Sequence, residues 1–290
     1  MEQEEQVEQE EQEEQVEQEE QEEQVEQEER TEDMHKVLAF ALDAGRVLLK
    51  NGAEIFRVEE TIEHICNYFH MDQVDTFVLS NGLFITAEQN ENELFAKVKH
   101  IPLSGIHLGI VTEVNDLSRE ICGGYISLDD AIQKLKRIEQ MPPKRNYFRV
   151  VAAGVGCGCF CYLLKANILE SIIAFFIGMV LFLFVIFAEK HQLTKVIVNI
   201  VGGSLITVFA IAASYIPFPT EIIVDKVIIG SILPLVPGVA FTNAIRDIAN
   251  SDFISGTVRM IDSMLVFVYI AIGVGFVLAT YTSILGGLHL

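Results

Sequence analysis

The pattern of apolar and polar positions divides the chain into three parts of different character. Residues 1–33 are almost entirely Glu and Gln, with one valine in every nine residues. Residues 34–143 show helical and strand periods typical of a small water-soluble domain. Residues 144–290 consist of apolar stretches separated by short polar ones. We therefore predict an acidic low-complexity N-terminal tail, a small cytosolic α+β domain and an α-helical polytopic membrane domain.

The N-terminal tail has too few apolar residues to form a core. Val7, Val16 and Val25 recur at a period of nine, which does not close onto one face of a 3.6-period helix. We interpret the tail as a solvated segment, disordered or partly helical; a coiled-coil oligomerisation arm is the alternative. It holds 18 acidic residues and one arginine, so most of the formal charge of −21 belongs to it. The remaining chain has no large basic patch, so nucleic acid is not an expected partner.

Periodicity predicts the elements of the cytosolic domain. Helical periods occur in four segments: residues 34–52, 53–69, 107–124 and 127–140. A period of two occurs in three segments: residues 74–80, 83–89 and 93–101. Asn81-Gly82 separates the first two strands and predicts a hairpin in which both residues take positive φ. Ser127 is a candidate N-cap of the last helix, with Asp129 and Asp130 in its first turn.

The third part predicts about five membrane-spanning helices in a lipid bilayer. The apolar stretches cover residues 150–164, 168–188, 196–216, 227–241 and 261–285. A helical span needs about 17–25 predominantly apolar residues, so the second, third and fifth stretches are long enough. The first and fourth are short and need tilt, flanking residues or neighbouring helices to span.

The basic residues near these stretches indicate an orientation. With residues 1–149 in the cytosol, seven basic residues fall on the cytosolic side: Lys144, Arg145, Arg149, Lys190, Lys195, Arg246 and Arg259. Two fall outside: Lys165 and Lys226. Basic residues favour cytoplasmic loops, so we expect the N-terminus in the cytoplasm and the C-terminus outside.

The fourth apolar stretch contains its own helix-breaking residues. Pro234 and Pro237 each remove a backbone N–H and clash with the preceding turn, and Gly238 follows directly. Free carbonyl groups at membrane depth are tolerated where protein or a water-filled cavity satisfies them. Transporter sites are often built from such interrupted helices. These three residues are therefore a candidate hinge in a broken helix.

Polar and charged residues follow the break at close spacing. They are Asn243, Arg246, Asp247, Asn250, Asp252 and Arg259. Residues 227–241 would rise about 22 Å as a helix, which places Arg246 near the cytoplasmic boundary. One interpretation is a substrate-binding site at the inner mouth of a transporter. The other is a proline-kinked span followed by an interfacial helix, in which Arg246 pairs with Asp247 or Asp252.

The cysteine-rich start of the membrane part does not have the spacing of a metal site. CGCFC at residues 157–161 lacks C-x-x-C spacing, and its thiols do not share one helix face. Together with Gly154, Gly156 and Gly158 it favours a small-residue surface for close helix packing, with metal or redox chemistry as the alternative. No Walker A motif and no G-x-G-x-x-G after a strand occur. We expect no metal, no cofactor and no ATP-driven pumping by this chain.

Two other functions are compatible with the pattern. A membrane-tethered hydrolase could use Ser104 with His100 or His107, but the G-x-S-x-G elbow is absent, so we do not expect an enzyme. A non-transporting anchor could display its cytosolic domain to assembly partners. Efflux measurements separate a transporter from both.

The order of these motifs resembles the N-terminal half of the threonine/serine exporter family, over about residues 34–285. The cytosolic part contributes three segments: NGAEIFRVEETI, SNGLFIT and HLGIVTEVNDLSREI. The most specific part is the pattern P-G-x-x-x-T-N-A-I-R-D-x-x-x-x-D-x-x-S-G-x-x-R at residues 237–259. The resemblance implies secondary transport across the bacterial inner membrane. Members export threonine and serine, and split members export small dicarboxylates such as succinate.

The resemblance also implies site residues and a partner. The matched positions that would bind substrate are Asn243, Arg246, Asp247, Asp252, Ser255 and Arg259. Arg246 would pair with a substrate carboxylate, and Asp247 or Asp252 would hold an ammonium group or a coupling proton. Full-length members carry a second membrane half that is absent here. A separate small polytopic membrane subunit is therefore the expected partner, and a homo-oligomer is also compatible.

Overall fold

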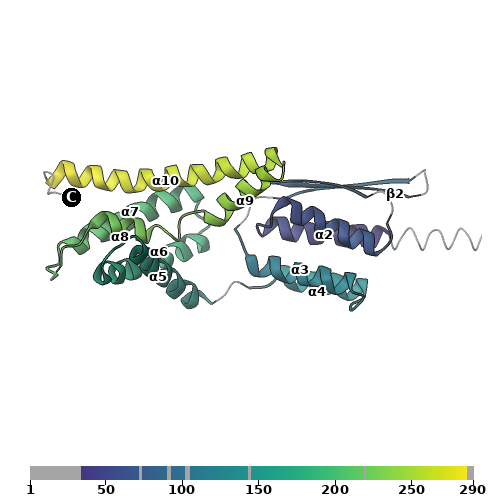
Figure 1. Cartoon of the computed structure of the whole chain (residues 1–290), viewed down its shortest axis with the longest axis horizontal. Helices are drawn as coiled ribbons and strands as arrows, with labels where there is room; N and C mark the ends of the chain where they lie inside the picture. Colours follow the sequence, from purple (N-terminus) through teal and green to yellow (C-terminus); the bar gives the residue numbers. More distant parts are fainter. Residues whose placement is uncertain are drawn as a thin grey trace, which may run out of the picture. The chain divides into compact units, whose positions relative to one another are not determined.

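The computed structural model divides the chain into two units, Met1–Met141 and Pro142–Leu290 (Figure 1). It describes residues 34–71, 74–89, 93–101, 105–142, 145–218 and 220–285. The interpretation of residues 1–33 as a solvated tail, and Ser104 of the hydrolase alternative, lie outside the described residues. Each unit has its own hydrophobic core.

The first unit is built from helices and one small sheet. Its elements are a helix over residues 34–50, α2 (Ile55–Tyr68), β1 (Val74–Leu79), β2 (Gly82–Gln89), β3 (Glu93–His100), α3 (Leu108–Cys122) and α4 (Leu128–Glu139). Each predicted helix and strand of this part is found within a few residues of its expected bounds. The predicted N-cap of α4 is confirmed, because the Ser127 hydroxyl accepts a hydrogen bond from the Asp130 N–H.

The sheet is antiparallel in the order β1-β2-β3. The hairpin between β1 and β2 is confirmed, but the expected positive φ at both Asn81 and Gly82 is wrong. Leu79 pairs with Gly82, so the two connecting residues are Ser80 and Asn81. Gly82 already belongs to the ladder, and a ladder position requires extended backbone.

The two faces of the sheet have different surroundings, as the alternation of side chains along a strand dictates. Val78 and Leu83 are a register pair that is buried against the helices. On the other face, Phe77, Phe84 and Val98 form one row across the three strands, and all three are exposed. The rings of Phe77 and Phe84 lie 6.1 Å apart.

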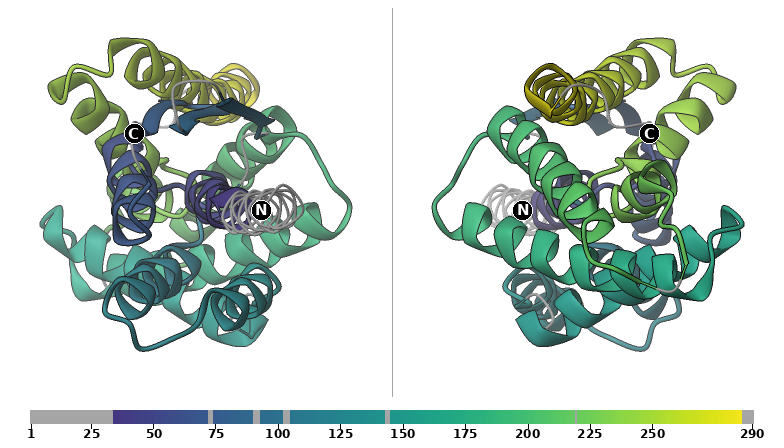
Figure 2. Two further views of the ribbon diagram at one scale, coloured as in Figure 1. Left: turned by 90° about the vertical axis from the view of Figure 1, so that its right-hand side faces the viewer. Right: turned by 90° about the vertical axis from the view of Figure 1, so that its left-hand side faces the viewer.

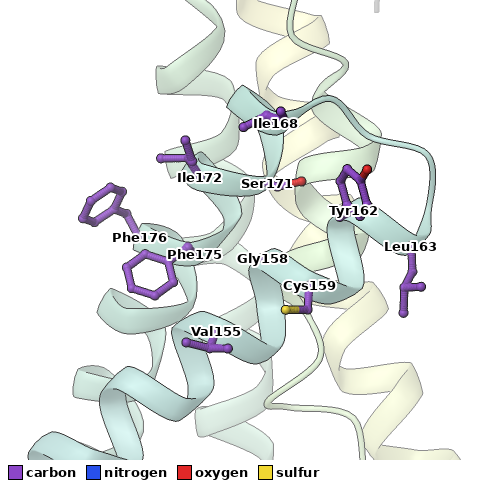
Figure 3. Close-up of a pocket in the computed structure, with 10 residues that line it drawn as sticks. All are labelled: Val155, Gly158, Cys159, Tyr162, Leu163, Ile168, Ser171, Ile172, Phe175 and Phe176. Carbon is purple, nitrogen blue, oxygen red and sulfur yellow. The ribbon is translucent and has the colours of Figure 1, made fainter.

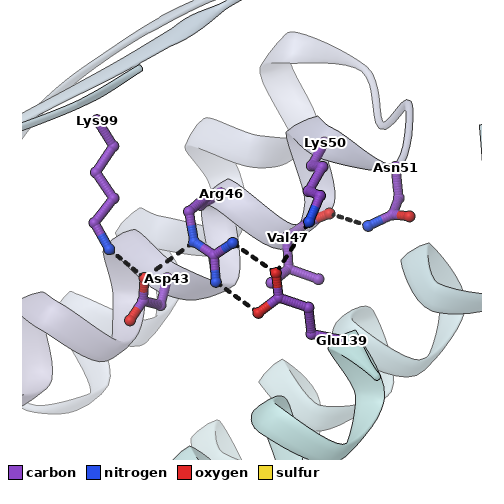
Figure 4. Close-up of polar contacts among 7 residues, drawn as sticks. All are labelled: Asp43, Arg46, Val47, Lys50, Asn51, Lys99 and Glu139. Atoms are coloured by element: carbon purple, nitrogen blue, oxygen red, sulfur yellow. Dashed lines mark hydrogen bonds and ion pairs between the residues drawn. The ribbon is translucent and has the colours of Figure 1, made fainter. Parts of the chain in front are cut away.

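A network of charged side chains joins the elements of the first unit (Figure 4). Arg46 donates two hydrogen bonds to the Glu139 carboxylate at 2.7 and 2.8 Å, and Lys50 donates a third at 3.2 Å. Asp43 accepts from Arg46 at 3.2 Å and also pairs with Lys99. Because the Arg46 guanidinium stabilises the carboxylate, the pKa of Glu139 falls to about 2. The network thus connects the first helix to α4 and β3.

The second unit is helical. Its elements are α5 (Asn146–Leu163), α6 (Ile168–Lys190), α7 (Lys195–Ser214), α8 (Val224–Ser231), α9 (Gly238–Ala249) and α10 (Phe253–Leu285). Among the described residues, α6, α7 and residues 253–284 of α10 are long and apolar enough to span a membrane. Figure 2 views this bundle end-on, with α10 in yellow and α7 in green. The apolar helices support a membrane location for the chain.

Small residues let α5 and α6 approach closely. A Cβ atom on Gly154 would lie 2.9 Å from the Phe175 carbonyl oxygen, and one on Gly158 would lie 3.0 Å from that of Ser171. Gly156 points elsewhere, with a Cβ position 3.4 Å from the Leu233 side chain. The glycines of α5 therefore serve two contacts, because they are not all on one face of the helix.

The contact between α7 and α10 is closer still. A Cβ atom on Gly273 would lie 2.1 Å from the Ile200 carbonyl oxygen, so only glycine permits this crossing. The Ser204 hydroxyl donates a hydrogen bond across the same contact to the Gly273 carbonyl at 3.1 Å. Backbone-to-backbone approach of this kind is how helices associate in a bilayer, where the hydrophobic effect between them is weak.

A buried carboxylate joins the starts of α6 and α8. Glu170 is 1% exposed, and its side chain accepts hydrogen bonds from the backbone N–H groups of Asn167 and Ile223 at 2.7 and 2.8 Å. The Asn167 side chain accepts from the Glu170 N–H in return, which completes a capping box. One side chain therefore caps α6 and holds the segment that enters α8.

Candidate functional site

The fourth predicted span is two short helices separated by a break at residues 232–237. The break contains both prolines, and Pro237 stands at the N-cap position of α9. Tight turns replace the helical ladder: the Leu235 N–H donates to the Ile232 carbonyl at 2.8 Å, and the Gly238 N–H donates to the Val236 carbonyl at 2.8 Å. The interruption follows from the missing proline N–H groups and ring clashes.

Behind the break, α9 and α10 form an antiparallel hairpin whose turn is residues 250–252. Ser251 takes a left-handed conformation with φ of 75°. The Asp252 N–H donates to the Asp247 carbonyl at 2.9 Å and closes the turn. A Cβ atom on Gly256 would lie 2.8 Å from the Ile248 nitrogen, so the two helices cross in close contact here.

An ion pair lies buried within this hairpin. The Arg259 guanidinium donates to the Asp247 carboxylate at 2.9 Å, and the two side chains are 10% and 0% exposed. Asp247 shares its helix face with Asn243, four residues earlier, and Ser255 is also buried. Taking both charges out of water is costly, so they depend on each other for compensation.

The remaining residues of the predicted cluster lie in less buried positions. Arg246 is on the exposed side of α9, and Asp252 is partly buried at the turn. In the alternative of a structural ion pair, Arg246 was expected to hold Asp247 or Asp252. The Arg259 guanidinium lies 2.9 Å from Asp247. Asn243 and Asp247 are four residues apart, which places them on one face of α9.

One residue at the break was not predicted. Ser231 ends α8 and is fully buried, and its hydroxyl is the one buried side-chain N or O atom among the described residues that has no hydrogen-bond partner. Its carbonyl accepts a weak hydrogen bond from the Cys157 thiol at 3.6 Å. An unpaired buried hydroxyl costs stability, so the stability of the fold does not explain a serine at the end of this interrupted helix.

An apolar pocket of about 740 Å³ lies between α5 and α6 (Figure 3). Its lining consists of Val155, Gly158, Cys159, Tyr162, Leu163, Ile168, Ser171, Ile172, Phe175 and Phe176. None of these side chains is charged. The pocket therefore suits hydrocarbon, and a charged solute would lose hydration there without compensation.

The structure describes the two histidines of the hydrolase alternative. His107 is the N-cap of α3, where its Nδ1 accepts a hydrogen bond from the Ile110 N–H at 3.1 Å. His100 ends β3. Within the part of the chain that the structure describes, no cluster of three His, Cys, Asp or Glu side chains could hold a metal ion.

Comparison with known proteins identifies relatives over most of the chain. The profile of the family described as "Putative threonine/serine exporter" matches residues 39–281. The chain is 25% identical over 251 residues to the "Probable succinate transporter subunit YjjP" of Escherichia coli (strain K12), covering 84% of this chain and 94% of that protein. It is 24% identical over 252 residues to the protein of the same description from Klebsiella aerogenes, covering 83% and 93%. No solved structure matches.

Proposed function

Because the chain belongs to the threonine/serine exporter family, we propose that it is a subunit of a secondary transporter that exports small carboxylate-bearing metabolites across the bacterial inner membrane. Threonine, serine and dicarboxylates such as succinate are the candidate solutes, in view of the descriptions of the family and the relatives. A small polytopic membrane protein is the proposed partner, since both relatives are named as subunits. Export across a membrane is the function that the family description names.

The proposed topology has five spans: α5, α6, α7, the broken pair α8–α9, and α10. The N-terminus is in the cytoplasm and the C-terminus is outside, which puts seven basic residues near cytosolic ends and two near outer ends. The α9–α10 hairpin then lies at the cytosolic side, where an exported solute enters. The break at residues 232–237 lies above it, within the membrane.

The observation that carries the proposal is the buried ion pair of Asp247 and Arg259 directly behind the broken helix. The pair places a guanidinium and a carboxylate, each compensating the other, in a place shielded from water. Arg246, on the exposed side of α9, receives the solute carboxylate, because a guanidinium binds a carboxylate through two parallel hydrogen bonds. Asp247 or Asp252 holds an ammonium group or the coupling proton. Pro234, Pro237 and Gly238 provide the hinge, and the polar set is completed by Asn243 and Ser255.

Efflux from proteoliposomes tests this function. The chain is reconstituted alone and together with the proposed small polytopic subunit, in liposomes loaded with labelled threonine, serine or succinate. We expect Arg246→Ala to reduce efflux about tenfold or more, since hydrogen bonds to a charged group contribute about 1.5–3 kcal/mol. Lys190→Ala removes an exposed cation at the end of α6 and is the matched control, with efflux unchanged.

Two outcomes would contradict the proposal at different levels. Wild-type efflux from the Arg246→Ala variant, at equal membrane insertion, would remove Arg246 from the site and leave the transporter function standing. No efflux of any of these solutes by the wild-type chain with its subunit would instead favour a non-transporting anchor.

A further inference from the structure

A second guanidinium lies beside the broken helix, away from the α9–α10 hairpin. Arg149 is in the first turn of α5 and lines a pocket of about 360 Å³ between α5, α6 and the break. The rest of the lining is apolar or small: Ala152, Ala153, Gly156, Phe182, Leu233 and Pro234. The pocket therefore combines one positive charge with an apolar wall.

The Arg149 side chain is already held in the geometry that binds a carboxylate. Its Nη1 and Nη2 atoms donate to the two oxygens of Glu189 at 3.1 and 2.8 Å. Its guanidinium carbon lies 5.2 Å from the centre of the Phe182 ring, which fixes the plane of the group. Arg149 is 24% exposed and Glu189 is 51% exposed. Glu189 can thus leave for water at little cost, whereas Arg149 stays in place.

We propose that this pocket is a carboxylate-binding subsite, in which a small carboxylate solute replaces Glu189 on the Arg149 guanidinium. The inference rests on the proposed export function and adds a binding site to it. The volume is near the lower end of the range of about 300–1,000 Å³ for ligand pockets, which suits a small metabolite. The apolar wall formed by Phe182 and Leu233 suits the hydrocarbon part of such a solute.

The subsite is continuous with the interrupted helix. Leu233 and Pro234 belong both to the pocket lining and to the break. Gly156, also in the lining, precedes Cys157, whose thiol contacts the carbonyl of Ser231 at 3.6 Å. The helix that lines the pocket therefore also contacts the end of α8.

Binding measurements on the full chain test the subsite. The protein is placed in nanodiscs of phosphatidylcholine and titrated with labelled succinate and labelled threonine. Arg149→Lys keeps the charge but loses the two-pronged contact, and we expect affinity to fall about tenfold. Glu189→Gln removes the competing carboxylate, and we expect affinity to rise about two- to fivefold, the range that an exposed ion pair contributes. A purely structural ion pair predicts no such rise.

Two further variants separate the pocket from general effects. Ala152→Leu fills the pocket from an exposed position without touching the ion pair, and we expect it to abolish binding while the melting temperature is retained. Asp262→Asn removes the carboxylate partner of Lys195, which is 3.3 Å away, and is the control for loss of an ion pair, with affinity unchanged.

The inference is overturned if Arg149→Lys and Ala152→Leu bind as the wild type does, or if Glu189→Gln weakens binding. It is also overturned if phosphatidylglycerol, but no small carboxylate, competes for Arg149, because the site would then hold a lipid headgroup. Efflux that continues unchanged in these variants contradicts this subsite alone. If the wild-type protein shows no efflux at all, the proposed function is contradicted instead.

Discussion

Gly273→Ala should separate α10 from α7, whereas Gly275→Ala, two residues later on the same helix, should not. A Cβ atom on Gly273 would lie 2.1 Å from the Ile200 carbonyl oxygen and 3.0 Å from the Ser204 nitrogen. A Cβ atom on Gly275 would meet nothing within 4 Å. The two variants therefore make the same chemical change in the same helix, and differ in what the new methyl group meets.

The expected magnitudes follow from this difference. Replacing Gly by Ala in a helix stabilises it by about 1 kcal/mol, so Gly275→Ala should be neutral or stabilising by up to that amount. At Gly273 the backbones must move apart by more than about 1 Å to reach ordinary contact, and overpacking of this kind costs about 1–3 kcal/mol. The hydrogen bond from Ser204 to the Gly273 carbonyl is stretched as well. We expect Gly273→Ala to be less stable than Gly275→Ala by about 2 kcal/mol or more.

Unfolding in mixed micelles, followed by circular dichroism during titration with sodium dodecyl sulfate, measures this difference. Because the clash is with backbone atoms, adding Ile200→Ala to Gly273→Ala should not restore stability. Equal midpoints for the two glycine variants would refute the close crossing. Rescue by Ile200→Ala would refute its backbone nature.

Three other predictions concern polar groups. Ser231→Ala removes an unpartnered hydroxyl, so the free energy of unfolding should rise by about 1 kcal/mol, which the same micelle titration measures. Asp247→Asn removes the counter-charge 2.9 Å from Arg259 and should cost about 3–5 kcal/mol; in a double-mutant cycle, adding Arg259→Met should recover part of this cost. The carboxylate of Glu139 has its pKa lowered from 4.5 to about 2 beside Arg46, so its stabilising effect is fully present above pH 4.5 and is lost as the pH falls through about 2; Glu139→Gln should remove this acid-dependent component from amide hydrogen exchange of the first unit.

Local patterns were sufficient to predict most elements of the first unit. The helical period, the N-cap at Ser127 and the change to a period of two are signals contained in a few neighbouring residues. The conformation of Asn81 and Gly82 was not predicted correctly, because the register of the hairpin decides which residues form the turn. Pairing of Leu79 with Gly82 shifted the turn by one residue. Sequence alone leaves such a shift open wherever neighbouring residues are all compatible with a turn.

The site was predictable only in part. The break at the two prolines followed from backbone chemistry, and the spacing of Asn243 and Asp247 could have shown which face of α9 is buried. The pairing of Asp247 with Arg259 could not be predicted by spacing, because Arg259 reaches it from the next helix. The helix α10 starts at Phe253, eight residues before the apolar stretch at residues 261–285. The Arg149 pocket depends on the packing of three separate segments, which no local pattern reports.

The length of α10 has a mechanical consequence. Its 33 residues extend about 50 Å, well beyond the hydrocarbon thickness of about 30 Å. Figure 1 shows it as one uninterrupted helix, and among its glycines Gly273 approaches a neighbouring helix most closely. Arg259 lies fourteen residues from Gly273, or about 21 Å along the helix axis. A rotation of α10 by about 10° about Gly273 would move the Arg259 guanidinium by about 4 Å. This is more than the length of the hydrogen bond that joins Arg259 to Asp247.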